Sequence, residues 1–458
     1  MEYAEFLDKK KIITPAVGFD AKEINEKLFP FQRDITRWAL KKGRAAVFAD
    51  CGLGKSPVQL EWAKRVCEHT GGNVLILAPL AVSTQTVREG EKFGIKVNAC
   101  RSQDQVKAGV NITNYEMLKH FNPYEFTGIV IDESSILKSY DAKTRTEIIE
   151  TFKNTPYRLA CTATPAPNDF MELGNHAEFL GVMSRSEMLS MFFVHDGGDT
   201  SKWRLKGHAI DKYWEWVASW AVLIRKPSDL GYEDGDFILP ELKMLQHTVN
   251  VSQPTVGCLF AVEAQTLQER QAARRSSVAD RVEKCAELVN ASDEPWIVWC
   301  NLNIESELLT KSINGAVEVK GSDTREHKEK SIIDFINGDI KVLVSKPSIF
   351  GYGMNLQHCR NEAFVGLSDS YEAYYQAVRR CWRFGQAKPV NVHVITAETE
   401  GAVVSNIQRK ERDSQVMIEE MLKHTKEITR KNIKGTERES TDYLPQQEMI
   451  IPDWMVQQ

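Results

Sequence analysis

A glycine-rich run, ADCGLGKS at positions 49–56, directly follows an apolar stretch that is typical of a buried strand. Gly52 and Gly54 leave backbone N–H groups open toward a ligand, because a side chain at either position would block a phosphate cradle. Lys55 is long enough to reach phosphate oxygens, and Ser56 offers a hydroxyl to Mg²⁺. A tight turn of the same composition is the alternative interpretation. Because strand, loop and helix patterns come in the required order, the run predicts a nucleotide phosphate site.

A second candidate is the acidic pair Asp132–Glu133, which closes the apolar strand pattern GIVIDE. Asp132 would hold Mg²⁺, directly or through water, and Glu133 would orient and deprotonate an attacking water. A surface turn or a helix cap is the competing interpretation of an acidic pair after a strand. Beside a phosphate loop in the same sheet, the pair predicts hydrolysis of a nucleotide.

Two further runs carry polar side chains at positions that chemistry could use. CTATP at 161–165 ends a strand pattern. Its hydroxyls would hydrogen-bond the acidic pair, and the simpler interpretation is a strand end stopped by proline. QAVRRCWRFGQ at 376–386 places Gln376, Arg380 and Arg383 on one face of a helix. Guanidinium groups there would stabilise charge on a transferring phosphoryl group, whereas a solvated arginine-rich helix face is the alternative.

Composition restricts the class of protein that could hold these groups. The chain has 458 residues, so we expect two or three domains, and its 42% hydrophobic and 26% charged residues are typical of a globular protein. No apolar run has the length of a membrane span, MEYAEFLDKK is not a signal-peptide pattern, and nine scattered cysteines without metal-ligand spacing indicate reduced core thiols. We therefore expect a cytoplasmic protein without membrane association. A net charge of −5 neither indicates nor excludes nucleic-acid binding.

The elements that must position these groups follow the rhythm of buried parallel sheets. The strands predicted in the first third are 44–49, 73–79, 109–113, 128–133 and 157–164. A second series is predicted at 296–301, 316–321, 341–346, 361–367 and 390–396. The sequence therefore predicts an α/β fold of two similar lobes, a mainly helical insertion and a polar tail, with the boundaries 1–167, 168–290, 291–425 and 426–458.

The order of these motifs resembles that of the superfamily 2 helicases and translocases, and most of all the Swi/Snf branch in a compact bacterial or phage form. The similarity spans about residues 28–410 and rests on the following runs: LFPFQRD, GLGKS, ITNYEML (112–118), IDESS, CTATP, GSDTREHKEKSIIDF (321–335), SKPSIFGYGMNLQ (345–357) and QAVRRCWRFGQ. In the last two runs the matching positions are Gly351, Gly353, Asn355, Leu356, Arg380, Arg383, Gly385 and Gln386.

The resemblance implies two RecA-like lobes that hydrolyse ATP between them with Mg²⁺, while nucleic acid, first of all double-stranded DNA, lies across both. The ATP-binding residues would then be Gln32 (against adenine), Gly52, Leu53, Gly54, Lys55, Ser56, Asp132 and Gly353. The catalytic residues would be Glu133, Gln376, Arg380 and Arg383. Coupling between nucleotide and nucleic acid would use Thr162, Ala163 and Thr164, and Mg²⁺ would bind Ser56 and Asp132.

The chain also departs from the family pattern. DESS stands where DEAH-like runs are usual, so Ser134 and Ser135 replace a small and a basic residue, and SKPSIF stands where a glycine-rich hydroxyl run is typical. No histone reader or zinc module is evident, which leaves nucleosome remodelling without support. The loop HDGGDTSKWRLKGH (195–208) is either a nucleic-acid-facing loop or an ordinary one. Three functions remain open: a duplex DNA translocase, an RNA helicase or motor subunit of a restriction or recombination complex, and a non-hydrolysing nucleic-acid-binding scaffold. A phage-encoded chain would act in the host cytoplasm.

Overall fold

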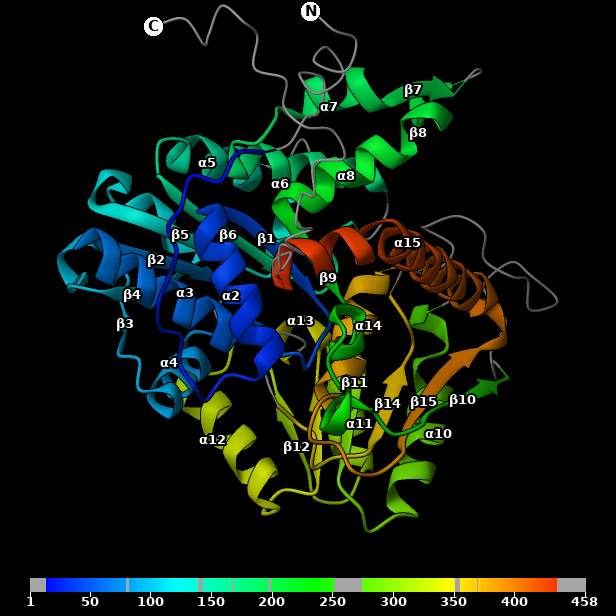
Figure 1. Ribbon diagram of the computed structural model, residues 1–458. Helices are drawn as coiled ribbons and strands as arrows, with labels where there is room; N and C mark the ends of the chain where they lie inside the picture. Colours follow the sequence, from blue (N-terminus) through cyan, green and yellow to red (C-terminus); the bar gives the residue numbers. More distant parts are fainter. Residues whose placement is uncertain are drawn as a thin grey trace, which may run out of the picture.

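Two parallel β-sheets organise the chain, one in each half of the sequence (Figure 1). The computed structural model describes residues 14–79, 82–138, 143–166, 169–196, 199–250, 274–350, 355–368 and 370–434. Within them, the first sheet has seven strands in the order β3-β4-β2-β5-β6-β1-β9, and the second has six in the order β10-β15-β14-β11-β13-β12. We call the first sheet with its helices lobe 1 and the second with its helices lobe 2. The predicted α/β fold with two parallel-sheet lobes is confirmed.

Lobe 1 is built on strands that are buried on both faces. Its strands are β1 (Arg44–Ala49), β2 (Asn73–Ala78), β3 (Val97–Ala99), β4 (Val110–Asn114), β5 (Phe126–Asp132), β6 (Tyr157–Thr162) and β9 (Ala221–Ile224). Side chains alternate between two cores, so that Ala45 and Val47 of β1 join one cluster and Ala46 and Phe48 join the other. The helices are α2 (Pro30–Lys42), α3 (Lys55–Thr70), α4 (Ser83–Phe93), α5 (Lys143–Phe152), α6 (Leu173–Leu180), α7 (Arg185–Phe192) and α8 (Ile210–Trp220).

Lobe 2 repeats this construction. Its strands are β10 (Leu242–Val249), β11 (Trp296–Cys300), β12 (Ala316–Val319), β13 (Val342–Ser345), β14 (Asn361–Val365) and β15 (Val390–Ala397). On β11, Ile297 and Trp299 enter one core, while Trp296 and Val298 enter the other. The helices are α10 (Val278–Asn290), α11 (Asn303–Ser312), α12 (Arg325–Asn337), α13 (Pro347–Phe350), α14 (Tyr371–Cys381) and α15 (Gly401–Lys434).

The last helix, α15, joins the two lobes physically (Figure 1). Near its start, Val403 and Ile407 are buried in the core of lobe 2. Farther along, Met421 is buried in a core of lobe 1, and Arg430 donates to the backbone oxygens of Asp229 and Ser228 at 3.0 and 2.9 Å. The helix therefore crosses the boundary that the sequence predicts at 425/426 and holds lobe 2 against lobe 1.

The stretch predicted as a mainly helical insertion contains strands as well as helices. β9 is an edge strand of the lobe 1 sheet, β10 is an edge strand of the lobe 2 sheet, and β7 (Phe193–Asp196) pairs with β8 (Asp199–Leu205) as a hairpin. The run DKYWEWVASWAVLIRK reads as one helix in the sequence because an apolar helix and a short buried strand share the same pattern without a break between them. The predicted domain boundaries stay a proposal.

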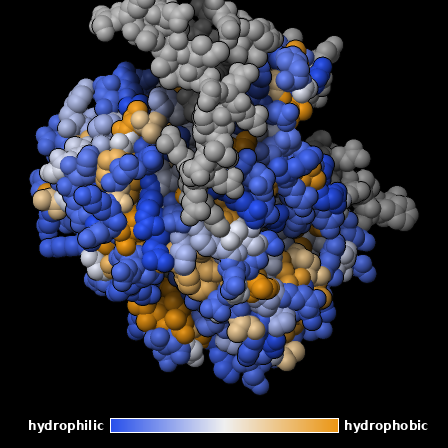
Figure 2. Space-filling view, viewed as in Figure 1, coloured by the Kyte–Doolittle hydropathy of each residue, from blue (hydrophilic) through white to orange (hydrophobic). Residues whose placement is uncertain are grey.

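The visible surface is mostly hydrophilic with several apolar patches, and one of these patches lies over α12 (Figure 2). There Ile333 and Ile336 are 38% and 44% exposed. Among the described residues, none of the helices combines the length and the apolar character that crossing a bilayer requires.

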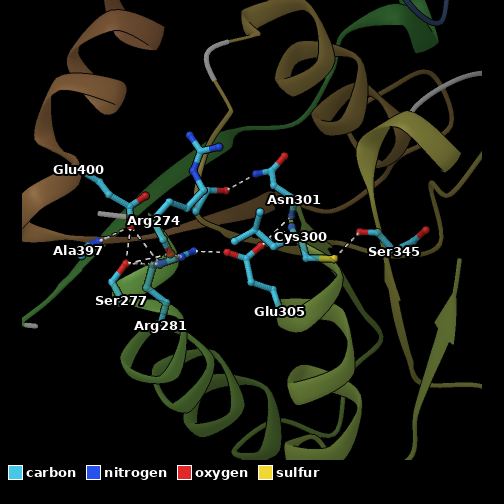
Figure 3. Close-up of polar contacts among 11 residues, drawn as sticks. Arg274, Ser277, Arg281, Cys300, Asn301, Glu305, Ser345, Ala397 and Glu400 are labelled. Atoms are coloured by element: carbon cyan, nitrogen blue, oxygen red, sulfur yellow. Dashed lines mark hydrogen bonds and ion pairs between the residues drawn. The ribbon is translucent and has the colours of Figure 1, made fainter. Parts of the chain in front are cut away.

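Lobe 2 also encloses a charged cluster at the carboxyl ends of its strands (Figure 3). Arg281 of α10 contacts Glu305 at 2.8 Å and Glu400 at 3.0 Å, and all three side chains have no exposed surface. Ser277 donates to Glu400 at 2.9 Å, and Glu305 accepts from the backbone N–H of Asn301 at 2.9 Å. These bonds tie α10, α11 and the start of α15 to the same edge of the sheet.

Candidate functional site

The glycine-rich run forms the loop between β1 and α3, as its sequence predicts. Gly52 and Gly54 have φ values of 91° and 76°, which lie in the left-handed region that favours glycine. A Cβ atom on Gly52 would lie 2.9 Å from the backbone nitrogen of Phe384, and one on Gly54 would lie 2.3 Å from Nε2 of Gln32. Both glycines are therefore required by backbone conformation and by space, the first of them because lobe 2 packs directly on the loop.

Gln32 and Lys55 hold the ends of this loop. Gln32 donates through Nε2 to the backbone oxygen of Leu53 at 2.8 Å and accepts from the N–H of Phe29 at 3.0 Å. Lys55 donates to the backbone oxygen of Ala49 at 3.0 Å. Gln32 thus lies against the phosphate loop, and its contact with adenine stays a prediction.

The acidic pair lies at the end of β5, next to the phosphate loop. Asp132 accepts from Nε2 of Gln59, on α3, at 2.7 Å. Burial raises the pKa of both carboxyls; the Gln59 hydrogen bond opposes this for Asp132, and the charge of Lys55 opposes it for Glu133. Two charged carboxylates at this place therefore depend on positive neighbours.

Glu133 is held in a strained conformation. Glu133 is the only non-glycine residue with a positive φ among the described residues, and its φ is 55°. A backbone of this kind costs about 1–3 kcal/mol and persists where the surroundings fix it, often at functional sites. Its Oε2 atom is buried, and no described residue donates a hydrogen bond to it. Within the part of the chain that the structure describes, this oxygen is therefore open to a ligand.

The coupling residues lie beside the acidic pair, on β6 and just after it. Thr162 is fully buried and its Oγ1 accepts from the N–H of Thr164 at 3.1 Å. Ala163 is also buried, and Oγ1 of Thr164 has no partner. Ser134 of the DESS run instead lies 3.1 Å from Nε2 of His176, whose pKa burial lowers to about 4. A neutral His176 on α6 therefore holds Ser134, and with it the acidic loop, through a hydrogen bond. The sequence did not predict this contact.

The arginine-rich run forms α14 and the turn after it, and it faces lobe 1. Arg380 donates to the backbone oxygen of Gln376 at 3.1 Å. Its positive charge, like that of Lys55, opposes the rise in the pKa of Glu133 that burial causes. Burial, and next the charge of Arg380, lowers the pKa of Arg383 to about 10. Gln376 is 2% exposed, and neither polar atom of its side chain has a partner among the described residues. The charges of Lys55 from lobe 1 and Arg380 from lobe 2 thus both act on Glu133, and Arg383 lies beside Gly52 of the phosphate loop.

Some residues around the site were missed by sequence reasoning, and the roles of the predicted site residues stay predictions. The missed residues are Asp50, Gln59, Lys138, His176, Glu372, Tyr375 and Arg379. Arg379 stands beside the predicted Arg380, but a helix turns 100° per residue, so the two point differently and spacing alone could not assign its partner. Gly351 and Gly353 lie outside the described residues.

Two family comparisons correspond to the two lobes. Residues 53–192 match the SNF2-related domain, and residues 280–385 match the helicase conserved C-terminal domain. The chain is a Snf2-like helicase of superfamily 2. Its lobes are accordingly the two RecA-like halves of an ATPase core, and the predicted family is confirmed.

Similar proteins were found by sequence and by structure. Protein p41 of Acyrthosiphon pisum secondary endosymbiont phage 1 is 22% identical over 470 residues, which cover 86% of this chain and 97% of that protein. The Sulfolobus solfataricus SWI2/SNF2 ATPase core in complex with dsDNA is 17% identical, with 91% of this chain and 99% of that chain covered and a TM-score of 0.42.

A cleft of about 1230 Å³ separates the lobes of this Snf2-like chain on the side that Glu133 lines. Four of the runs that carry the family resemblance contribute to it: ITNYEML through Tyr115, IDESS through Glu133, GSDTREHKEKSIIDF through Asp323 and SKPSIFGYGMNLQ through Ile349. Its basic lining residues are Arg88, Lys92, Arg101, Lys119, Lys138 and Lys328. The volume exceeds the range of about 300–1,000 Å³ that is usual for small-molecule pockets.

The loop 195–208 folds largely into the β7–β8 hairpin and the turn after it, and residues 197 and 198 lie outside the described part. Trp203 packs against the lobe 1 core, and its ring lies 3.7 Å from that of His195. Packing accounts for the tryptophan, and a nucleic-acid contact by the hairpin stays a prediction.

Proposed function

We propose that the chain hydrolyses ATP between its lobes and uses the cycle to move along or remodel double-stranded DNA. The observation that carries the proposal is the surrounding of Glu133. This carboxylate has a buried oxygen to which no described residue donates, and the charges of Lys55 from lobe 1 and Arg380 from lobe 2 both act on the carboxylate. An acid aimed into a space between two cations suits a water that attacks a phosphate.

Each residue then has one task in hydrolysis. The N–H groups of the glycine-rich loop and Lys55 bind the phosphates, and Gln32 contacts the adenine. Glu133 accepts the proton of the attacking water. Arg380 and Arg383 stabilise the charge that develops on the transferred group. Gln376, buried with two free hydrogen-bonding atoms, orients the water or the phosphate.

The residues also fit a magnesium ion. Asp132 and Ser56 supply the oxygen ligands that Mg²⁺ prefers, and this metal is usually held by one or two carboxylates together with substrate phosphates. Bound there, Mg²⁺ would neutralise phosphate charge during transfer. Gln59 orients the Asp132 carboxylate through its 2.7 Å hydrogen bond.

The family and the basic residues that line the cleft favour duplex DNA as the partner. The cleft is larger than a small-molecule site, and five basic residues of lobe 1 line it: Arg88, Lys92, Arg101, Lys119 and Lys138. Such residues would contact phosphates, so binding should tolerate any sequence and weaken with salt. Membership of the Snf2-like branch favours duplex over single strands. A phage-encoded protein of this kind would act in the host cytoplasm.

The test is ATP hydrolysis by the purified protein, alone and with duplex DNA, single-stranded DNA or RNA. Glu133→Gln keeps the phosphate cradle but removes the base, so ATP should still bind while turnover falls about 10²–10⁴-fold. Lys55→Ala should instead weaken ATP binding itself. The exposed Glu125 of the same lobe offers a control, since Glu125→Gln should change neither quantity.

Three results would contradict the proposal. Normal turnover by Glu133→Gln would remove Glu133 from the catalytic role. Stimulation by single strands or RNA rather than duplex DNA would favour an RNA helicase or a conventional strand-separating helicase. No hydrolysis under any condition would favour a non-hydrolysing scaffold.

A further inference from the structure

Helix α14 touches lobe 1 at both of its ends through side chains to which no catalytic task has been given. Glu372 and Arg379 are seven residues apart and therefore lie on one face of the helix, with Gln376 between them. All three are buried, with exposed fractions of 8%, 3% and 2% for Glu372, Arg379 and Gln376. A buried charge needs a partner, and both charged residues find it in lobe 1.

Arg379 docks the carboxyl end of the helix on the phosphate loop. Its guanidinium lies 3.0 Å from Oδ1 of Asp50 and donates to the backbone oxygen of Cys51 at 2.6 Å. Tyr375, one turn earlier, donates its hydroxyl proton to the same Asp50 oxygen at 2.5 Å. The ring of Trp382 lies 4.8 Å from the guanidinium carbon and limits its movement. Two side chains of lobe 2 therefore converge on one carboxylate of lobe 1.

Asp50 is itself fixed. Its backbone N–H donates to Ile224 of β9 at 3.0 Å, and its carboxylate accepts from the N–H of Cys51 at 2.6 Å. Gly52 follows directly, with no room for a Cβ against Phe384 of lobe 2. The Asp50–Arg379 contact can therefore form only when the phosphate loop has this conformation.

Glu372 docks the amino end of the helix on the acidic loop. It forms an ion pair with Lys138, which follows the DESS run. Asn175 of α6 donates to the backbone oxygen of Lys138 at 3.0 Å and holds that segment in place. The two contacts have opposite polarity, acid from lobe 2 at one end and base from lobe 2 at the other. A reversed helix would place Glu372 beside Asp50 and Arg379 beside Lys138, so the charges favour one orientation of α14.

We infer that the pairs Lys138–Glu372 and Asp50–Arg379 are a two-point dock that sets α14 against both catalytic loops and so positions Gln376, Arg380 and Arg383. This inference rests on the proposed function, because it gives the dock its task. The four residues act through the helix and not on the substrate, so they are positioning residues. When the lobes separate, both pairs must break together, and when the lobes close, both must form before the arginines lie over the phosphates.

The first experiment compares Arg379→Ala with a matched control. Arg360→Ala removes an ion pair with Glu294 of 2.6 Å that stays within lobe 2. Because a displacement of about 1 Å can cost about 10²-fold in rate, Arg379→Ala should lower kcat by about that factor and change the KM for ATP much less. Arg379→Lys keeps the positive charge but loses the planar guanidinium. Its kcat should therefore lie between those of Arg379→Ala and the wild type. Arg360→Ala should behave as the wild type.

The second experiment reverses a pair. Lys138→Glu and Glu372→Lys should each lower kcat, and the double variant should recover most of it, since the opposite charges meet again. A merely structural role for these residues would lower the yield or the unfolding temperature without such recovery. Failure of the double variant to exceed the single variants would overturn the inference for this pair.

The third experiment does not depend on ATP. Dyes attached through unnatural amino acids at Tyr124 of lobe 1, 81% exposed, and Lys341 of lobe 2, 62% exposed, report the separation of the lobes in nucleotide-free protein. Arg379→Ala should broaden the distance distribution and shift it to larger values, and Arg360→Ala should not. An unchanged distribution together with wild-type kcat would overturn the inference. If the wild type does not hydrolyse ATP, the proposed function fails, and the distance measurement still decides whether the dock exists.

Discussion

Arg281 and Arg379 are both buried arginines paired with carboxylates, and they do different things. Arg281 is fully buried inside lobe 2, where Glu305 and Glu400 lie 2.8 and 3.0 Å away (Figure 3). Arg379 is 3% exposed, and its partner Asp50 lies in the other lobe. Burial and pairing are alike in the two clusters. What differs is whether the pair joins elements of one lobe or elements that can separate.

The difference shows how one kind of interaction serves two purposes. The partners of Arg281 both belong to lobe 2, Glu305 on α11 and Glu400 just after β15, so no motion of the lobes can part them. The partner of Arg379 belongs to the phosphate loop, and it moves away whenever the lobes open. A buried ion pair contributes to the stability of a lobe in the first case, and to the arrangement of two lobes in the second.

The largest expected effect is on the stability of lobe 2. Arg281→Ala leaves the carboxylates of Glu305 and Glu400 buried without their cation, which should lower the free energy of unfolding by about 3–5 kcal/mol. Urea unfolding followed by tryptophan fluorescence measures the loss. Arg360→Ala, which removes a half-exposed pair, should cost about 1 kcal/mol or less. If Arg379→Ala were found to destabilise the protein as much as Arg281→Ala, the distinction between the clusters would fail.

A second prediction concerns pH and the core of lobe 2. Burial raises the pKa of Glu362, which accepts from Nε1 of Trp299 at 2.9 Å, from its ordinary 4.5 to about 8. The folded lobe keeps a proton on this group between those two values, whereas the unfolded chain releases it. The free energy of unfolding should therefore fall as pH rises through that window, by at most about 1.4 kcal/mol per pH unit.

Glu362→Gln tests this dependence, since an amide of the same shape does not titrate. Urea unfolding at several pH values from 5 to 8.5 should give a shallower pH dependence for Glu362→Gln than for the wild type. Equal slopes for the two proteins would show that Glu362 is ionised in the folded lobe and would contradict the prediction.

The smallest expected effect is at the far end of α15. Arg430→Ala removes the two hydrogen bonds to Asp229 and Ser228 of lobe 1, which should cost about 1–2 kcal/mol. Hydrogen exchange should then speed up in the last turns of α15 while the cores exchange as before. Arg409 of the same helix is the control, because its pair with Asp413 is exposed and contributes little. Faster exchange throughout lobe 1 would mean that α15 is part of its core rather than a tie between the lobes.

The sequence determined the two sheets and the chemistry at their edges. Buried parallel strands are short apolar runs between polar stops, so all ten predicted strands have counterparts in the sheets. The phosphate loop and the acidic pair are local patterns that follow a strand. Gly52, Lys55 and Glu133 could therefore be named from residue type and spacing alone.

Tertiary structure decided which residues meet across the chain. β9 joins the lobe 1 sheet beside β1, although the two are far apart in sequence, and its apolar run continues a helix pattern without a break. Likewise, Asp50 and Arg379 are 329 positions apart, and neither has a neighbour in sequence that reveals the other. A local pattern records what a segment buries, whereas contact between distant segments depends on how the lobes pack. The local motifs thus identified the residues for the chemistry. The contacts that hold these motifs together, such as Asp50–Arg379, were decided by the packing of one lobe on the other.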